Sequence, residues 1–306
     1  MWIILSFVSA LCLGCYDISK KIALRDNRVI DVLTLSVCIS TALLAIPWVL
    51  SRTCPEMMTA TPFYVPQLDL AAHGLVVLKS LIVLSSWVFA YISLKHLPLS
   101  VVSPMQATRP MWTLVGALVL FDERLNGWQW VGVSLAIGTV FIFSFANKSR
   151  LKEAKSEVDM KYYICLALAI LIGACSGLYD KYLMRSYNHN AVQVYYTLYQ
   201  AIMMVLVWLF VNRKNITHQT SCITHIKNIG VIAMISVFLI ISDNVYMLAL
   251  RDPDSLIAVV STIRRGGAVI GFAYGLLFLK EQDPWKKIVC MLGILAGLIC
   301  LAIGSC

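Results

Sequence analysis

Ten long apolar runs dominate the sequence and leave few folds open to it. They cover roughly residues 2–20, 31–50, 70–94, 98–121, 128–146, 161–183, 191–211, 228–250, 255–279 and 287–304. A helix needs about 20 apolar residues to cross the hydrocarbon core of a bilayer, and each run is close to that length. The alternating pattern of a transmembrane barrel is absent. With a mean hydropathy of +0.79 and only 13% charged residues, the chain is predicted to be an all-α polytopic membrane protein with ten transmembrane helices.

Two similar tetrads mark an internal repeat: GCYD at residues 14–17 and GLYD at residues 177–180. A shift of 155 residues aligns more pairs: Tyr91 with Tyr246, Pro98 with Pro253, Ser100 with Ser255 and Arg109 with Arg264. After a small insertion, Glu123 also matches Glu281. An ordered series of this length indicates duplication. We expect two five-helix units, residues 1–146 and 161–306, joined by a basic linker, residues 147–160.

The odd number of spans in each unit determines how the two units insert. After five crossings the chain is on the opposite side of the membrane, so the second unit enters upside down relative to the first. Inverted repeats of this kind build many secondary transporters, whose substrate site lies near the bilayer midplane where the repeats meet. The sequence therefore predicts two inverted five-helix repeats around one central site.

Two longer segments resemble a known family. They are LPLSVVSPMQATRPMWTLVGALVLFDERLNGWQWVGVSLAIG in the first half and DPDSLIAVVSTIRRGGAVIGFAYGLLFLKEQDPW in the second. Together with the five-span repeat, they resemble EamA-type transporters of the drug/metabolite transporter superfamily, in which Pro-x-Ser at the start of span four is followed by a glutamate before span five. The resemblance implies a ten-helix transporter fold. It does not define the substrate, because members handle amino acids, sugars, nucleotide sugars and toxic compounds.

The basic residues are unevenly distributed among the loops. Of the 25 Lys and Arg residues, sixteen lie in loops after the odd-numbered spans and five in the other loops. The positive-inside rule places the richer set in the cytoplasm and both termini outside, whereas members of the family usually have their termini inside. We expect a multi-pass protein of the plasma membrane, in a bacterium the inner membrane. The net charge of +9 is explained by topology, so no nucleic-acid partner is predicted.

Charged residues inside the apolar runs are the main candidates for a site. Inserting an ionisable side chain at the centre of a transmembrane helix costs about 2.5–3.5 kcal/mol on insertion scales, so each such residue is expected to have a structural or functional role. Arg109 and Arg264 lie about ten residues into their runs and are related by the repeat. We interpret Arg109, Arg264 and Arg265 as ligands of a substrate carboxylate or phosphate. Other candidates for the cavity wall are Gln106 and four tyrosines, for which ordinary helix packing is the alternative: Tyr16, Tyr91, Tyr179 and Tyr246.

The arginines can instead neutralise buried acids. Asp243 is expected at a depth similar to that of Arg264, so a structural ion pair is a credible alternative for Arg264. The position in the first half that corresponds to Asp243 is Val88, which leaves Arg109 without a repeat-related acid. Arg109 is therefore the preferred substrate ligand.

Four further embedded charges suggest ion pairs. Lys79 is expected to pair with Asp17, either as a structural bridge or as a proton-coupling pair. Asp180 and Lys181 are expected closer to a membrane interface, partly solvated. The ten cysteines lie mostly in apolar runs, where cysteine acts as a small hydrophobe, so no metal site and no cofactor are predicted.

These features favour a secondary transporter of a small anionic or zwitterionic metabolite. Direct ATP use is unsupported because the sequence has no GxxxxGK[ST] loop. An intramembrane lipid-modifying enzyme is the alternative from another functional class. Such an enzyme would need a catalytic group at membrane depth, but the histidines of this chain lie in or beside loops, so no catalytic residue is predicted. A non-transporting assembly protein is a third possibility. The expected partners are the substrate and the lipid bilayer, and the protein is expected to be a monomer or a homodimer.

Overall fold

The computed structural model describes residues 1–25, 27–96, 105–106, 108–146, 160–217, 227–267, 269–270, 273–274 and 284–305. Within these ranges the chain forms eleven helices and no strand. In order, they are α1 (Trp2–Leu24), α2 (Val29–Thr53), α3 (Pro55–Thr59), α4 (Leu70–His96), α6 (Arg109–Leu120), α7 (Gly127–Ala146), α8 (Met160–Ser186), α9 (His189–Thr217), α10 (Ile229–Arg251), α11 (Ile257–Arg265) and α13 (Pro284–Gly304).

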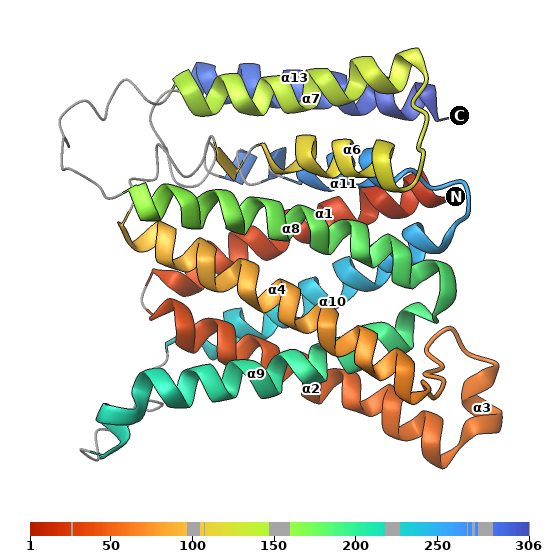
Figure 1. Cartoon of the computed structure of the whole chain (residues 1–306), viewed down its shortest axis with the longest axis vertical. Coiled ribbons are helices and arrows are strands. Elements are labelled where there is room, and N and C mark those ends of the chain that lie inside the picture. Colours follow the sequence, from red (N-terminus) through yellow and green to blue (C-terminus); the bar gives the residue numbers. More distant parts are fainter. Residues whose placement is uncertain are drawn as a thin grey trace.

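Six of the described helices are long and apolar enough to cross a membrane. They lie in α1, α2, α4, α8, α9 and α10, and two shorter apolar helices span Arg109–Leu120 and Ile288–Gly304. The expected fourth and ninth runs include residues 98–104, 107, 268, 271–272 and 275–279, which lie outside the described residues. The two chain ends lie at the same end of the helix bundle (Figure 1). The chain is thus an all-α membrane protein.

Helices of the first half pack mainly against helices of the second half. α1 contacts α10 and α11, while α4 contacts α8 and α9. α2 lies against α9 and α10, α6 against α8 and α11, and α7 against α13. Figure 1 shows α7 and α13 stacked at one edge of the bundle and α2 and α9 at the opposite edge. The core between these edges is therefore built jointly by residues from both halves of the sequence.

Small residues bring α7 and α13 into close contact. A Cβ atom added to Gly297 would lie 2.9 Å from the backbone oxygen of Gly132 and 2.9 Å from the backbone nitrogen of Ala136. A Cβ atom added to Gly132 would in turn lie 2.8 Å from the backbone oxygen of Gly297. Because these neighbours are backbone atoms, they cannot rotate away. Glycine at these two positions allows the close backbone approach that is typical of transmembrane helix pairs.

Gly297→Ala is expected to lower the melting temperature of the purified protein by several degrees. The added methyl group has to push α7 away from α13, and overpacking of this kind costs about 1–3 kcal/mol. Gly138→Ala, on α7 itself, is the matched control because no atom lies within 4 Å of its added Cβ atom. The melting temperatures of both variants can be measured in detergent by monitoring tryptophan fluorescence during heating. Equal melting temperatures for the two variants would contradict the close contact.

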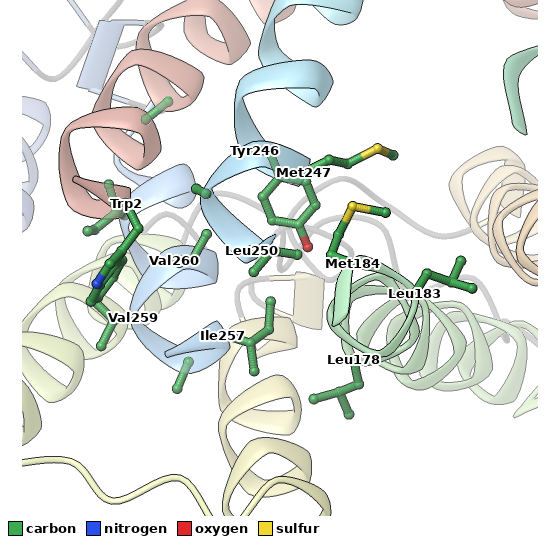
Figure 2. Close-up of a cluster of buried hydrophobic side chains, with 14 of the residues drawn as sticks. Trp2, Leu178, Leu183, Met184, Tyr246, Met247, Leu250, Ile257, Val259 and Val260 are labelled. Atoms are coloured by element: carbon green, nitrogen blue, oxygen red, sulfur yellow. The ribbon is translucent and has the colours of Figure 1, made fainter. Parts of the chain in front are cut away.

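Buried side chains fill the end of the bundle that holds the two termini. Figure 2 shows Trp2, Met184, Leu250 and Ile257 in one hydrophobic cluster, contributed by α1, α8, α10 and α11. Each of these four side chains is at most 7% exposed. The hydroxyl of Tyr246 also points into the region between α10 and α8 (Figure 2). This packing seals the centre of the protein on the side of the termini.

Candidate functional site

A cavity of about 360 Å³ lies where α1, α4, α6, α8, α10 and α11 converge. Its described wall carries eight charged side chains from these six helices: Asp17, Lys20, Lys79, Arg109, Asp180, Asp243, Arg264 and Arg265. Four aromatic residues complete much of the remaining wall: Tyr16, Trp87, Tyr196 and Tyr246. The volume lies at the lower end of the range of about 300–1,000 Å³ that is usual for small-molecule sites. The cavity can therefore accommodate a small polar solute.

Helix ends bring the arginines to this cavity. α6 begins at Arg109, and Pro110 occupies its first turn, where the missing N–H removes no helical hydrogen bond. α11 ends with Arg264 and Arg265. The sequence placed all three within long apolar runs, whereas the structure places them at the ends of short helices. Backbone hydrogen bonds continue past both helix ends, from the N–H of Thr108 to the oxygen of Met105 at 3.0 Å and from the N–H of Gly267 to the oxygen of Arg264 at 3.2 Å.

The guanidinium of Arg109 makes one described hydrogen bond, to the backbone of α8. Its Nη2 donates a hydrogen bond to the backbone oxygen of Gly173 on α8 at 2.5 Å. A Cβ atom on Gly173 would lie 2.6 Å from Cζ of Arg109, so glycine allows the guanidinium to lie against the α8 backbone. Arg109 makes no ion pair with any residue that the structure describes. Since a guanidinium has five N–H donors, further donors of Arg109 are available to a ligand in the cavity.

Arg264 forms the ion pair that the sequence left open as an alternative. Its Nη2 lies 2.7 Å from Oδ1 of Asp243 and 3.2 Å from Oγ of Ser242. Its Cζ lies 4.0 Å from the ring centroid of Tyr246, a distance typical of a cation–π contact. The charge of Arg264 is thus neutralised within the wall.

Arg265 is exposed although it lies at the centre of the bundle, and it faces the same cavity as the exposed Asp17. Among the described residues, Arg265 forms no ion pair within 4 Å. Lys20 follows Asp17 by about one helical turn, and its Nζ lies 5.6 Å from the ring centroid of Tyr16. Arg265 and Arg109 are therefore the two cavity guanidiniums that form no ion pair within 4 Å in the described part of the chain.

The expected pairing of Lys79 with Asp17 is wrong. Lys79 instead pairs with Asp180, and its Nζ lies 4.5 Å from the ring centroid of Tyr196. Asp180 is also not partly solvated as expected, since it is only 8% exposed and Lys79 is 2% exposed. The physical reason is helix packing: α4 lies along α8, whereas α1 lies along α10. The resulting buried bridge connects the two halves of the chain.

The candidate wall residues divide between the cavity and other positions. Tyr16 and Tyr246 line the cavity, but Tyr179 does not: its hydroxyl donates to the backbone oxygen of Leu75 at 3.1 Å. Gln106 is also absent from the described wall. Tyr91 lies on α4, with its side chain outside the described part of the structure.

Several wall residues were not anticipated from the sequence. Trp87 and Tyr196 line the cavity although neither belongs to the repeat pattern. Tyr196 lies next to the Lys79–Asp180 bridge, on α9, and is only 9% exposed. Tyr196 is one of several polar residues in the apolar seventh run, so the sequence alone did not single it out. Which face of this helix points to the cavity became clear only from the packing of α9 on α4.

Glu123 and Lys181 form a second buried bridge near the end that holds the termini. Nζ of Lys181 lies 2.6 Å from Oε1 of Glu123 and also donates to the backbone oxygen of Ser255. The carboxylate of Glu123 accepts hydrogen bonds from the backbone N–H groups at the start of α11, at 2.7 Å from Ile257 and 3.2 Å from Ala258. Glu123 is 6% and Lys181 3% exposed. The expectation of a partly solvated Lys181 is therefore wrong, because the segment after α6 supplies a buried carboxylate.

Among the described residues, no group of three or more His, Cys, Asp and Glu side chains is arranged to hold a metal ion. The described polar groups of the cavity are three guanidiniums, two ammoniums, three carboxylates and several hydroxyls, and guanidiniums are well suited to bind organic anions.

Comparison with known proteins finds a family model that matches the first half of the chain. The model of the EamA-like transporter family matches residues 1–145, which confirms the resemblance seen in the sequence. A solved structure described only as "Crystal structure of protein" has a similar fold: the TM-score is 0.71 at 12% sequence identity, over 99% of this chain and 96% of that chain. No curated protein sequence matches this chain.

Proposed function

We propose that this protein, whose residues 1–145 match the model of the EamA-like transporter family, is a secondary active transporter. Its substrate is a small anionic or zwitterionic metabolite, which binds in the central cavity and crosses the membrane by alternating access. The family supports membrane transport as the general function. The substrate class and the mechanism are inferred from the cavity, and the proposed location is the plasma membrane.

One observation carries the substrate class: two cavity arginines, Arg109 and Arg265, have no acidic partner among the described residues. A cation away from bulk water is costly, and evolution retains it mainly where it has a function. Guanidiniums present planar, bidentate donors that match carboxylate and phosphate groups. An anionic group that enters the cavity would satisfy these donors, and this gain compensates for the loss of its hydration.

Alternating access is supported by the symmetry of the helix contacts: a contact of a first-half helix with a second-half helix has an equivalent contact with the two halves interchanged. The contact of α1 with α10 corresponds to that of α8 with α4, and the contact of α2 with α10 to that of α9 with α4. α2 with α9 and α7 with α13 pair equivalent helices. Such exchange is what two inverted five-helix repeats would produce, with residues 1–146 and 161–306 as the repeats and 147–160 as their linker. Two repeats related in this way can rock about a shared central site.

Uptake by the purified full-length protein in liposomes tests the proposal. We expect saturable uptake of at least one compound from a panel of amino acids, organic acids and sugar phosphates, and no saturable uptake by protein-free liposomes. The Arg124→Gln variant is a suitable positive control, because the side chain of Arg124 is 88% exposed and lies outside the cavity. If the protein instead transported only lipophilic cations, or none of the panel, the proposed function would be wrong.

A further inference from the structure

We infer that the substrate is a compact dianion, an inference that rests on the proposed function. The described cavity wall holds five basic side chains and three acidic ones. The basic ones are Lys20, Lys79, Arg109, Arg264 and Arg265, and the acidic ones are Asp17, Asp180 and Asp243. Two positive charges are therefore in excess. This excess does not depend on which acid is assigned to which base.

Contacts in the wall locate the excess. Lys79 is paired with Asp180, and Arg264 with Asp243. Asp17 lies about one turn before Lys20 on α1, a spacing at which opposite charges on a helix interact, and it also faces the cavity that Arg265 lines. Arg109, at the start of α6, and Arg265, at the end of α11, form neither of the two ion pairs, and with Lys20 they share the single negative charge of Asp17.

The electrostatic consequence depends on the charge of the solute. Like charges that share a cavity between packed helices repel each other more strongly than in bulk water, because the effective dielectric constant beside protein is lower. A zwitterion adds no net charge and leaves both cations uncompensated. A monoanion compensates one of them. A dianion compensates both, so it gains the most on entering this cavity.

The geometry also limits the size of the solute. Arg109 and Arg265 approach from two different helices that contact each other, α6 and α11. The cavity volume of about 360 Å³ favours a small molecule over a nucleotide-sized one. Two chemical forms meet these conditions: a short dicarboxylate with one carboxylate for each arginine, and a phosphate monoester, which carries about −1.5 to −2 charge at pH 7. The dicarboxylate and the phosphate monoester both carry about two negative charges, which would compensate the two excess positive charges of the wall.

The experiment compares solutes of different charge in liposomes that contain the full-length protein at about pH 7.5, where a phosphate monoester is mostly doubly ionised. Succinate and glycerol 3-phosphate are the dianions, lactate is the monoanion and alanine is the zwitterion. We expect uptake of at least one dianion to exceed that of lactate and alanine by about tenfold, which corresponds to about 1.4 kcal/mol. Whichever of the two dianions shows the higher uptake indicates whether the substrate is a dicarboxylate or a phosphate monoester.

Charge variants then test the residue that sets this preference. In Arg265→Gln the ratio of dianion to lactate uptake should fall about tenfold, since one of the two excess charges is gone. Arg265→Lys retains the charge and should restore most of the ratio, which a merely structural role of the guanidinium would not do. Arg124→Gln, at an exposed position, should leave the ratio unchanged.

The outcomes separate this inference from the proposed function. Saturable uptake of lactate or alanine at or above the level of both dianions would overturn the dianion inference and leave the transporter proposal standing. The dianion inference alone would also be overturned if Arg265→Gln kept the wild-type ratio while its melting temperature showed that it is folded. Failure to transport either dianion, together with failure of both dianions to raise the melting temperature, would overturn the dianion inference, whereas the proposed function would be overturned only if no compound of the wider panel of amino acids, organic acids and sugar phosphates were transported.

Discussion

Replacing Arg109 with glutamine is expected to reduce substrate uptake by about 100-fold and to leave the amount of folded protein in the membrane unchanged. Truncating one partner of a buried, hydrogen-bonded charge pair costs about 2–5 kcal/mol of binding free energy. Arg109 approaches the cavity from the start of α6 and is anchored through a single described hydrogen bond, to Gly173. Glutamine is uncharged and cannot offer a bidentate pair of donors to an anion. Initial uptake rates in liposomes, normalised to reconstituted protein, measure the loss.

A comparison with Arg264 separates binding from structure. Arg109 has no acidic partner among the described residues, so its replacement strands no carboxylate and should keep or slightly raise the melting temperature. Arg264→Gln removes the partner of Asp243 and should lower the melting temperature by several degrees. If Arg109→Gln destabilised the protein as strongly as Arg264→Gln, or transported at the wild-type rate, Arg109 would be a structural residue.

Arg109→Lys refines the interpretation. Lysine keeps the positive charge but presents a point charge instead of a planar fork, and the two residues are not equivalent at bidentate sites. We expect uptake by this variant to be intermediate, with a higher KM and a smaller change in the maximal rate. Wild-type kinetics for Arg109→Lys would show that charge alone is sufficient at this position.

The depth of residues along each helix was predictable from the sequence. The rise per residue in a helix is fixed at about 1.5 Å, so the position of a charge within an apolar run indicates its depth in the membrane. On this basis Asp243 and Arg264 were expected at similar depths, and the structure brings them to 2.7 Å. The same reasoning placed Arg109 near the midplane, and Arg109 lines the central cavity. The all-helical membrane fold followed from run length and composition.

The neighbours of each helix were not predictable in the same way. Hydropathy specifies that a segment is buried but not which helix lies beside it. Lys79 was expected to pair with Asp17, yet α4 packs on α8, and the partner is Asp180. Lys181, like Asp180, was expected closer to a membrane interface and partly solvated. Its burial depends on Glu123, which lies 58 residues away in the sequence, in a segment between two helices.

Replacing Glu123 with glutamine is expected to cause the largest loss of stability of any single change considered. Its carboxylate accepts hydrogen bonds from two N–H groups at the start of α11 and neutralises Lys181 on α8. The side chains of both members of this pair are at most 4% exposed. Removing one partner of such a pair leaves an uncompensated buried charge, which costs about 3–5 kcal/mol. The melting temperature in detergent should therefore drop by roughly 10 °C.

Asp122→Asn provides the matched control for Glu123→Gln. Asp122 is the adjacent residue and faces Arg124 at 4.0 Å, but both side chains are more than 85% exposed. Exposed ion pairs contribute about 0–1 kcal/mol. The backbone φ of 49° at Asp122 also suits asparagine, which tolerates the left-handed region. The two variants thus remove the same kind of charge at neighbouring positions, and only the buried one should lower the melting temperature.

A double variant tests whether the stranded lysine is the cause of the loss. In Glu123→Gln combined with Lys181→Met no buried charge remains, and replacing both members of a buried pair by groups of similar volume is often neutral. We expect the double variant to unfold at a higher temperature than Glu123→Gln alone, although below wild type, because an amide has a single acceptor oxygen for the two N–H groups of α11. A double variant no more stable than the single one would place the main contribution of Glu123 in the helix cap. Since α11 ends at Arg264 and Arg265, the same measurements also show how firmly the cavity arginines are fixed through their own helix.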